Sequence, residues 1–224
     1  MLVHNHFQRQ DGVTLTEMMI AVAINAVLLV GLVSIFVMNL NHHRESIEES
    51  RLSQQMHSAM DVMVLEIRRA GYWSNSRVDI GTDTNTNPFM AIGTDIAVNA
   101  SNNCILFTYD HDKNGALAAI SSSSDDERYG FRLMNNAIQA RPPGAAFDCN
   151  AVTSAWEDIT DQGVIQVTAL VFTLNEDTVI TGPGPIGITI RSVDISMTGA
   201  LTGNASVTKT LTQHVRLRND KYVY

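Results

Sequence analysis

The sequence predicts an α+β fold, in which one long N-terminal helix packs on an antiparallel β-sheet domain. Three observations support this prediction. The 23 residues from Met18 to Leu40 contain no charged side chain, and apolar residues continue at helical spacing after them. From Cys104 onward, short segments instead alternate apolar and polar residues, which is typical of strands with one buried face. A helix followed by a series of strands is the element order of α+β domains.

The first segment, residues 1–12, is short and polar, and the uncharged run begins soon after it. Signal peptides have an apolar core of roughly 7–15 residues. As a helix, the uncharged run is longer, about 35 Å at ~1.5 Å per residue, which is enough to cross a bilayer core. We therefore expect a retained membrane anchor. The alternatives are a discarded signal peptide, a buried core helix and an ordinary single-pass signal anchor.

We expect one continuous helix from Thr14 to about Ala70, because apolar residues recur at helical intervals with charged residues between them. These apolar residues are Ile47, Leu52, Met56, Met60, Met63, Val64 and Ile67. Methionine fills irregular gaps well, so we interpret the methionines as core packing and not as a ligand set. Gly71 is predicted to stop the helix.

The remainder is predicted to be loops and strands. Residues 74–103 are rich in Asp, Asn, Thr and Gly and are predicted as loop. A change in the parity of the apolar alternation predicts a β-bulge near Arg191-Ser192. Residues 182–185 are predicted as a turn, and residues 121–127 as a solvated loop. The predicted strands are Cys104–Tyr109, Tyr129–Met134, Ala137–Arg141, Val164–Leu174, Ile186–Met197 and Val207–Leu217.

One charged residue, Glu17, stands at the start of the apolar run. A carboxylate in hydrocarbon is costly, and such residues are usually paired and functional. With the preceding residues from Gly12, Gly-Val-Thr-Leu-Thr-Glu, it resembles the prepilin cleavage signature of type IV pilins and type II secretion pseudopilins. The resemblance implies that prepilin peptidase cleaves between Gly12 and Val13 and that the amine of Val13 is N-methylated. It also implies that Glu17 compensates the N-terminal amine of a neighbouring subunit.

Two residues depart from this signature. Val13 stands where phenylalanine is commonest, and Thr16 where an aliphatic residue is usual. Other segments are similar to PilW-type minor pilins and to the minor pseudopilin J of type II secretion. These segments are Arg68–Tyr72, Cys104–Asp110, Tyr129–Leu133 and Val215–Asn219.

The resemblance implies a pilin-like fold in four parts. These are a leader at 1–12, a transmembrane and assembly half of the helix at 13–40, an amphipathic half at 41–73 and a β-rich periplasmic domain at 74–224. It implies a minor pilin of the inner-membrane bilayer that helps to prime type IV pilus assembly and sits at the pilus tip. The implied partners are other minor pilins, the major pilin and prepilin peptidase.

The sequence leaves three other functions open. The first is the same role in a type II secretion pseudopilus, and the second is a tip adhesin or ligand-binding module that uses the polar loops 74–103 and 110–128. The third is an anchored periplasmic enzyme. The sequence contains no His-Glu-x-x-His, no Gly-x-Ser-x-Gly and no Gly-rich phosphate loop, so no enzymatic activity is predicted. The net charge of −8 argues against nucleic acid as a partner of the bulk surface.

The two cysteines, Cys104 and Cys149, predict a disulfide, because an even count in a chain with an export-type N-terminus suggests an oxidising compartment. The alternative is two unrelated buried thiols.

No cofactor is predicted apart from one candidate calcium site. Asp110, Asp112 and Asn114 stand at alternate positions and are followed by Gly115, as in the first half of a calcium loop. The expected bidentate glutamate is absent, since Ser121 takes its place, and Asp125, Asp126 or Glu127 could supply it only by a longer return of the chain. The alternative is an Asx-rich turn between strands.

Overall fold

The computed structural model describes residues 12–79, 86–152, 155–180 and 187–223. The chain divides into two compact units, Met1–Ile47 and Glu48–Tyr224. The predicted leader, apart from Gly12, and the predicted turn at 182–185 lie outside the described residues.

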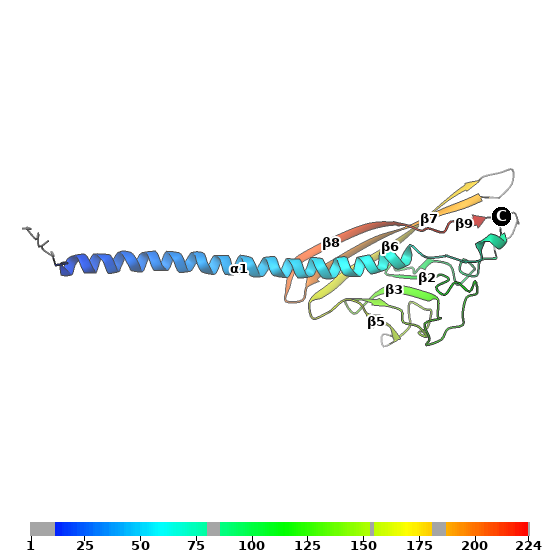
Figure 1. Ribbon diagram of the computed structural model, residues 1–224, viewed down its shortest axis with the longest axis horizontal. Coiled ribbons are helices and arrows are strands. Elements are labelled where there is room, and N and C mark those ends of the chain that lie inside the picture. Colours follow the sequence, from blue (N-terminus) through cyan, green and yellow to red (C-terminus); the bar gives the residue numbers. More distant parts are fainter. Residues whose placement is uncertain (1–11, 80–85, 153–154, 181–186, 224) are drawn as a thin grey trace, which may run out of the picture. The chain divides into compact units, whose positions relative to one another are not determined.

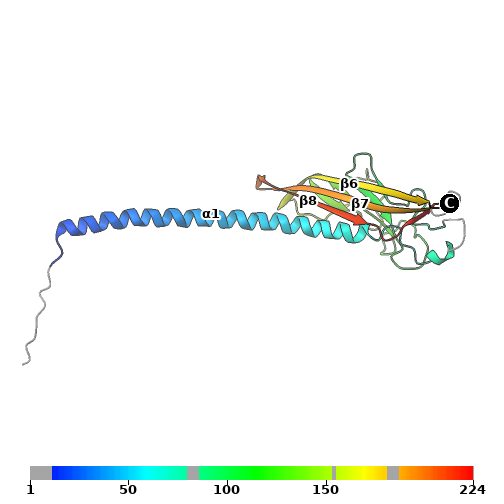
Figure 2. The same ribbon diagram turned by 90° about the horizontal axis from the view of Figure 1, so that it is seen from above.

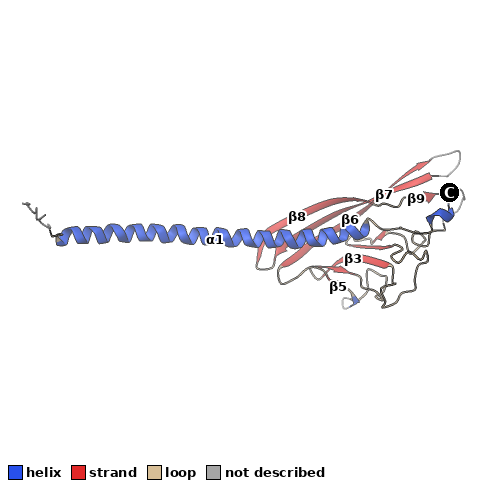
Figure 3. Ribbon diagram, viewed as in Figure 1, coloured by secondary structure: helices blue, strands red, loops and turns tan. Residues whose placement is uncertain are grey.

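Helix α1 spans Leu15–Ile67 (Figure 3). Its residues belong to both units, with the division after Ile47. It starts directly after Thr14, whose hydroxyl accepts a hydrogen bond from the helix as an N-cap residue does. The helix ends a few residues earlier than the sequence predicted. Gly71 then turns the chain with a φ of +74°, where a Cβ would collide with the side chain of Met90. Glycine suits this position because it has no Cβ and adopts positive φ readily.

A five-stranded antiparallel sheet has the order β1-β2-β3-β4-β5. Its strands are β1 (Ala97–Val98), β2 (Cys104–Thr108), β3 (Arg128–Met134), β4 (Ala137–Ala140) and β5 (Glu157–Asp158). Strands β2, β3 and β4 were predicted from the sequence. Strands β1 and β5 were not, because two residues are too few to show an alternation. Asn135 and Asn136 connect β3 to β4 with φ values of 51° and 63°, which suit a two-residue hairpin turn.

A second antiparallel sheet contains four strands, with β7 paired to β6, β8 and β9. These strands are β6 (Ile165–Ile180), β7 (Gly187–Leu201), β8 (Asn204–Arg216) and β9 (Lys221–Val223). The three long predicted strands are therefore confirmed. In the described residues, β6 and β7 both extend beyond the predicted limits.

The predicted bulge near Arg191-Ser192 is wrong. The pairing of β7 with β6 is regular there, and the register shifts lie instead between Val167 and Ala169 and between Ala200 and Leu201. The inward positions continue through Thr189 and Arg191, both of which are buried. Polar side chains at two inward positions made the apolar pattern appear to change parity, although the strand itself does not slip.

One hydrophobic core joins the C-terminal part of α1 to both sheets. Figures 1 and 2 show β7 and β8 running alongside this part of α1. The buried face of the helix consists of Leu52, Met56, Ala59, Met60, Met63 and Ile67. Its partners include Phe107 and Phe131 from the first sheet, and Phe172 and Ile195 from the second. The α+β prediction and the interpretation of the methionines as core packing are both confirmed.

Candidate functional site

The first candidate site is the N-terminal turn of α1. The Glu17 carboxylate accepts hydrogen bonds from Thr14 N at 2.9 Å and from Thr14 Oγ1 at 2.8 Å. The Glu17 N–H in turn donates to Thr14 Oγ1 at 3.4 Å. This reciprocal pairing is a capping box, which satisfies backbone groups that a helix start leaves without partners. The pattern Thr-x-x-Glu is visible in the sequence and was missed there.

The half of α1 that follows Glu17 is apolar on every side. The large apolar side chains from Val13 to Leu40 are each between 44% and 77% exposed. Among the described residues, α1 is the helix long and apolar enough to cross a membrane. A soluble monomer rarely exposes a continuous apolar surface of this kind. By length and composition, this segment fits a membrane anchor.

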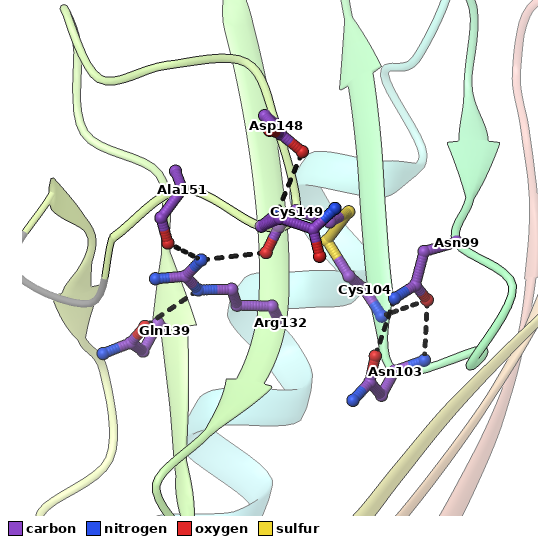
Figure 4. Close-up of a disulfide and its surroundings, with 9 residues drawn as sticks. Asn99, Asn103, Cys104, Arg132, Gln139, Asp148, Cys149 and Ala151 are labelled. Carbon is purple, nitrogen blue, oxygen red and sulfur yellow. Dashed lines mark hydrogen bonds between the residues drawn. A yellow bond between two sulfur atoms is a disulfide. The ribbon is translucent and has the colours of Figure 1, made fainter.

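The second site surrounds the disulfide between Cys104 and Cys149, whose Cα atoms are 6.0 Å apart. The predicted pairing is thus confirmed. Arg132 is buried beside it, and its Nη1 donates to the carbonyl oxygens of Cys149 at 2.9 Å and Ala151 at 2.7 Å (Figure 4). Its Nε donates to Gln139 Oε1 at 2.9 Å. The disulfide and this guanidinium together fix the loop after β4 against β2 and β3.

The third site is a cluster of carboxylates from Asp110, Asp112 and Glu127. One oxygen of each residue lies within 4.8 Å of the other two. The strand register explains the approach, because Thr108 pairs with Arg128 and so places Asp110 close to Glu127 at the base of the loop. The structure therefore brings two of the predicted calcium ligands together with a glutamate that lies 15 residues further along the chain than Asp112.

Asp110 is 2% exposed, and only one of its two carboxylate oxygens accepts hydrogen bonds from the described residues. Its Oδ2 accepts hydrogen bonds from Ser74 N at 2.9 Å and Gly115 N at 3.2 Å. Its Oδ1 is buried and has no hydrogen-bond partner among the described residues.

Glu127 is fully buried. Its two oxygens each accept one backbone hydrogen bond, from His111 N at 2.8 Å and from Ala118 N at 3.2 Å. Burial raises the pKa of Glu127, and the nearby charges of Asp112 and Asp110 add to this effect, while the two N–H groups oppose it.

Asn114, the third predicted ligand, makes local contacts. Its Oδ1 accepts a hydrogen bond from Ala116 N at 2.7 Å, and its Nδ2 donates to Asp112 Oδ2 at 2.6 Å. These contacts form an Asx-type turn that orients Asp112. Asp112 itself is exposed.

The prediction of a solvated loop at 121–127 is wrong for its last two residues, since Asp126 and Glu127 are buried. Asp126 Oδ2 accepts hydrogen bonds from Arg141 Nη2 and from Gly144 N, both at 2.8 Å. Burial by itself raises the pKa of Asp126, but these two donors outweigh it and hold the pKa below its ordinary value. Arg128, two residues away, also lies 3.5 Å from Asp126 Oδ1, but the fully buried partner Arg141 is 15 residues away, so the charged run alone gave no sign of that contact.

Two protein families match the chain. The family described as Prepilin peptidase-dependent protein B matches residues 45–217, and the Prokaryotic N-terminal methylation motif matches residues 7–33. Neither a curated protein nor a solved structure matches the chain. The first match covers most of the folded unit, and the second covers the N-terminal turn with Glu17 and much of the apolar segment.

Proposed function

Since the chain belongs to the prepilin peptidase-dependent protein B family, we propose that it is a minor pilin of the PilW type. In this role it is a structural subunit that helps to prime assembly of a type IV pilus and sits at the pilus tip. The observation that carries the proposal is the N-terminal methylation motif on a long helix whose apolar half is exposed. A folded domain follows on the same chain, as in the pilin-like fold.

Processing is the first step of the proposed role. Prepilin peptidase removes residues 1–12, so that the mature chain begins at Val13 with an N-methylated amine. Gly12 has no side chain to obstruct the protease, and a Cβ built there meets no atom within 4 Å. Gly12 and Val13, on either side of the proposed cleavage point, are exposed and precede α1.

Membrane anchoring and assembly follow from the exposed segment. Residues 13–40 lie in the inner membrane until the subunit joins other minor pilins and the major pilin, and the β-rich domain lies in the periplasm. In the membrane and in the assembled pilus alike, the apolar side chains are shielded from water. The hydrophobic effect is the main driving force for keeping them there. Glu17 pairs with the Val13 amine of a neighbouring subunit when the helices assemble. This role requires no covalent chemistry from the chain.

Intact-mass analysis of the chain extracted from membranes tests the processing step. We expect a mass that begins at Val13 and carries one methyl group, and the unprocessed mass in cells that lack prepilin peptidase. Retention of Met1 in cells with the peptidase would contradict the proposal.

Deletion of the gene tests the assignment to a pilus. We expect loss of surface fibres and of twitching, and co-purification of other pilin-like chains with the tagged protein. Loss of protein secretion with twitching intact would assign the chain to a type II secretion pseudopilus instead. Normal fibre numbers with lost surface attachment would favour a tip adhesin.

A further inference from the structure

The carboxylate cluster of Asp110, Asp112 and Glu127 carries more negative charge than its surroundings balance. Three carboxylates approach within 4.8 Å of one another, and two of them are almost fully buried. Among the described residues, no lysine, arginine or histidine forms an ion pair with any of the three. Buried charges without a partner are strongly unfavourable, so a cation or bound protons must neutralise this cluster.

A second observation favours a cation. Asp110 Oδ1 is a buried oxygen without a hydrogen-bond partner, whereas Oδ2 of the same carboxylate accepts two backbone N–H groups. A buried acceptor left without a partner costs free energy unless something binds it. Each oxygen of Glu127 accepts only one hydrogen bond from the described residues, so each keeps a lone pair. The cluster therefore has oriented oxygens whose coordination is incomplete.

We propose that Asp110, Asp112 and Glu127 bind a calcium ion. The ligands are all carboxylate oxygens, which are the hard ligands that calcium and magnesium prefer. Calcium accepts six to eight oxygens in flexible geometry, while magnesium requires a near-ideal octahedron. Carboxylates fixed by separate backbone contacts suit the more tolerant ion, and water completes its coordination.

The ion connects two segments that are distant in sequence. Asp110 already holds Ser74 N, which follows the end of α1, and Glu127 already holds His111 N and Ala118 N in the loop. A calcium ion between these carboxylates fixes the loop from Asp110 to Glu127 on the ends of β2 and β3 that it connects. This inference does not depend on the pilus role, because the cluster lies within the folded unit.

The test uses the full chain in detergent, stripped of metal with EDTA and titrated with CaCl₂ or MgCl₂. Trp73 is a built-in probe, since its Nε1 donates to Gly115 O at 2.8 Å in the same loop. We expect a saturable calorimetric binding signal with a Kd on the order of 10⁻⁴–10⁻³ M or tighter, as in calcium modules outside the cytosol. We also expect calcium to raise the melting temperature measured by tryptophan fluorescence, and magnesium to raise it less.

Asp112→Asn is the decisive variant because Asp112 is exposed and asparagine can keep the local turn. It should weaken calcium binding by about tenfold or more, because affinity depends on ligand charge. Asp125→Asn removes an exposed charge from the same loop and should bind calcium as the parent does.

Three results would overturn the assignment. Calcium without effect on the parent would show that protons neutralise the cluster, and an equal loss in both variants would show general charge screening. Binding of magnesium as tight as that of calcium would also overturn the choice of calcium. Glu127→Gln adds support if it folds, but the conclusion rests on the comparison of Asp112→Asn with Asp125→Asn.

Discussion

Arg191 shows how a single buried charge is accommodated on the inner face of β7. It is fully buried, and its Nη1 donates to Asp95 Oδ1 at 2.6 Å, while its Nη2 donates to Asn219 O at 3.0 Å. Asp95 has a second cation, since Lys221 Nζ lies 2.7 Å from its other oxygen. The ion pair is therefore asymmetric, because only the arginine depends on a single carboxylate.

This asymmetry predicts unequal effects of two substitutions. Asp95→Ala leaves a buried guanidinium without a counter-charge and should lower the free energy of unfolding by about 3–5 kcal/mol. Arg191→Met should lower the free energy of unfolding clearly less, because Asp95 retains Lys221 as its partner and methionine fills a similar volume. Denaturant unfolding followed by tryptophan fluorescence measures both, since Trp73 and Trp156 lie in the folded unit. If Arg191→Met lowered the free energy of unfolding more than Asp95→Ala does, this account would be contradicted.

At the scale of elements, the C-terminal part of α1 has one face in the core and one face in solvent. Met63 is 0% exposed, whereas Leu65, two residues later, is 57% exposed. Met63→Ala should therefore lower the free energy of unfolding by about 2–5 kcal/mol through lost burial and a residual cavity. Leu65→Ala is the matched control and should change it by no more than about 0.5 kcal/mol. Thermal unfolding of the isolated subunit compares the two, and equal costs would mean that the helix packs with a different face.

The disulfide acts on the first sheet by connecting β2 to the loop that follows β4. Its two cysteines are 45 residues apart. The double substitution of Cys104 and Cys149 by serine should lower the free energy of unfolding by about 2–4 kcal/mol, because the unfolded chain gains freedom. Alkylation of denatured, non-reduced parent protein should label neither cysteine. Labelling of both would show that the bond does not form in the cell.

The sequence was sufficient to predict the elements whose apolar pattern lies within their own residues. Helix α1, the central strands of the first sheet and the three long strands of the second follow from periodicity in their own residues. The sequence was insufficient where a distant residue decides the environment. Arg191 faces the core because Asp95, far earlier in the chain, lies opposite it. Glu127 joins the carboxylate cluster because β2 and β3 pair in one particular register.

At the scale of the whole molecule, the two units depend on different surroundings for their stability. The unit Glu48–Tyr224 has its own core and a disulfide. The segment 13–40 has exposed apolar side chains, which lipid or neighbouring helices would cover in the proposed role. A substitution in the first helical turn should therefore leave the folded unit unchanged and act on insertion or assembly.

The separate dependence of the two units can be tested at Glu17. Its carboxylate has two roles, and each can be removed by a different substitution. It accepts the Thr14 N–H in the capping box, and in the proposed pilus it pairs with the amine of Val13. Glu17→Gln keeps an oxygen for the cap and removes the charge, whereas Thr14→Ala removes the capping hydroxyl and keeps the charge. If the charge drives assembly, Glu17→Gln should insert and fold normally but lose fibre assembly and co-purification with other pilins. Thr14→Ala should retain both fibre assembly and co-purification with other pilins.

These outcomes are measured by membrane fractionation, by the tryptophan-monitored melting temperature and by counting surface fibres. Because a cap contributes about 0.5–2 kcal/mol of helix stability, Thr14→Ala should at most fray the first turn. Equal defects in Glu17→Gln and Thr14→Ala would show that the cap, and not the charge, is the determinant. Normal assembly of Glu17→Gln would show that the pairing with the Val13 amine is not needed. Failure of Glu17→Gln to insert would mean that the carboxylate acts before assembly, at the membrane surface.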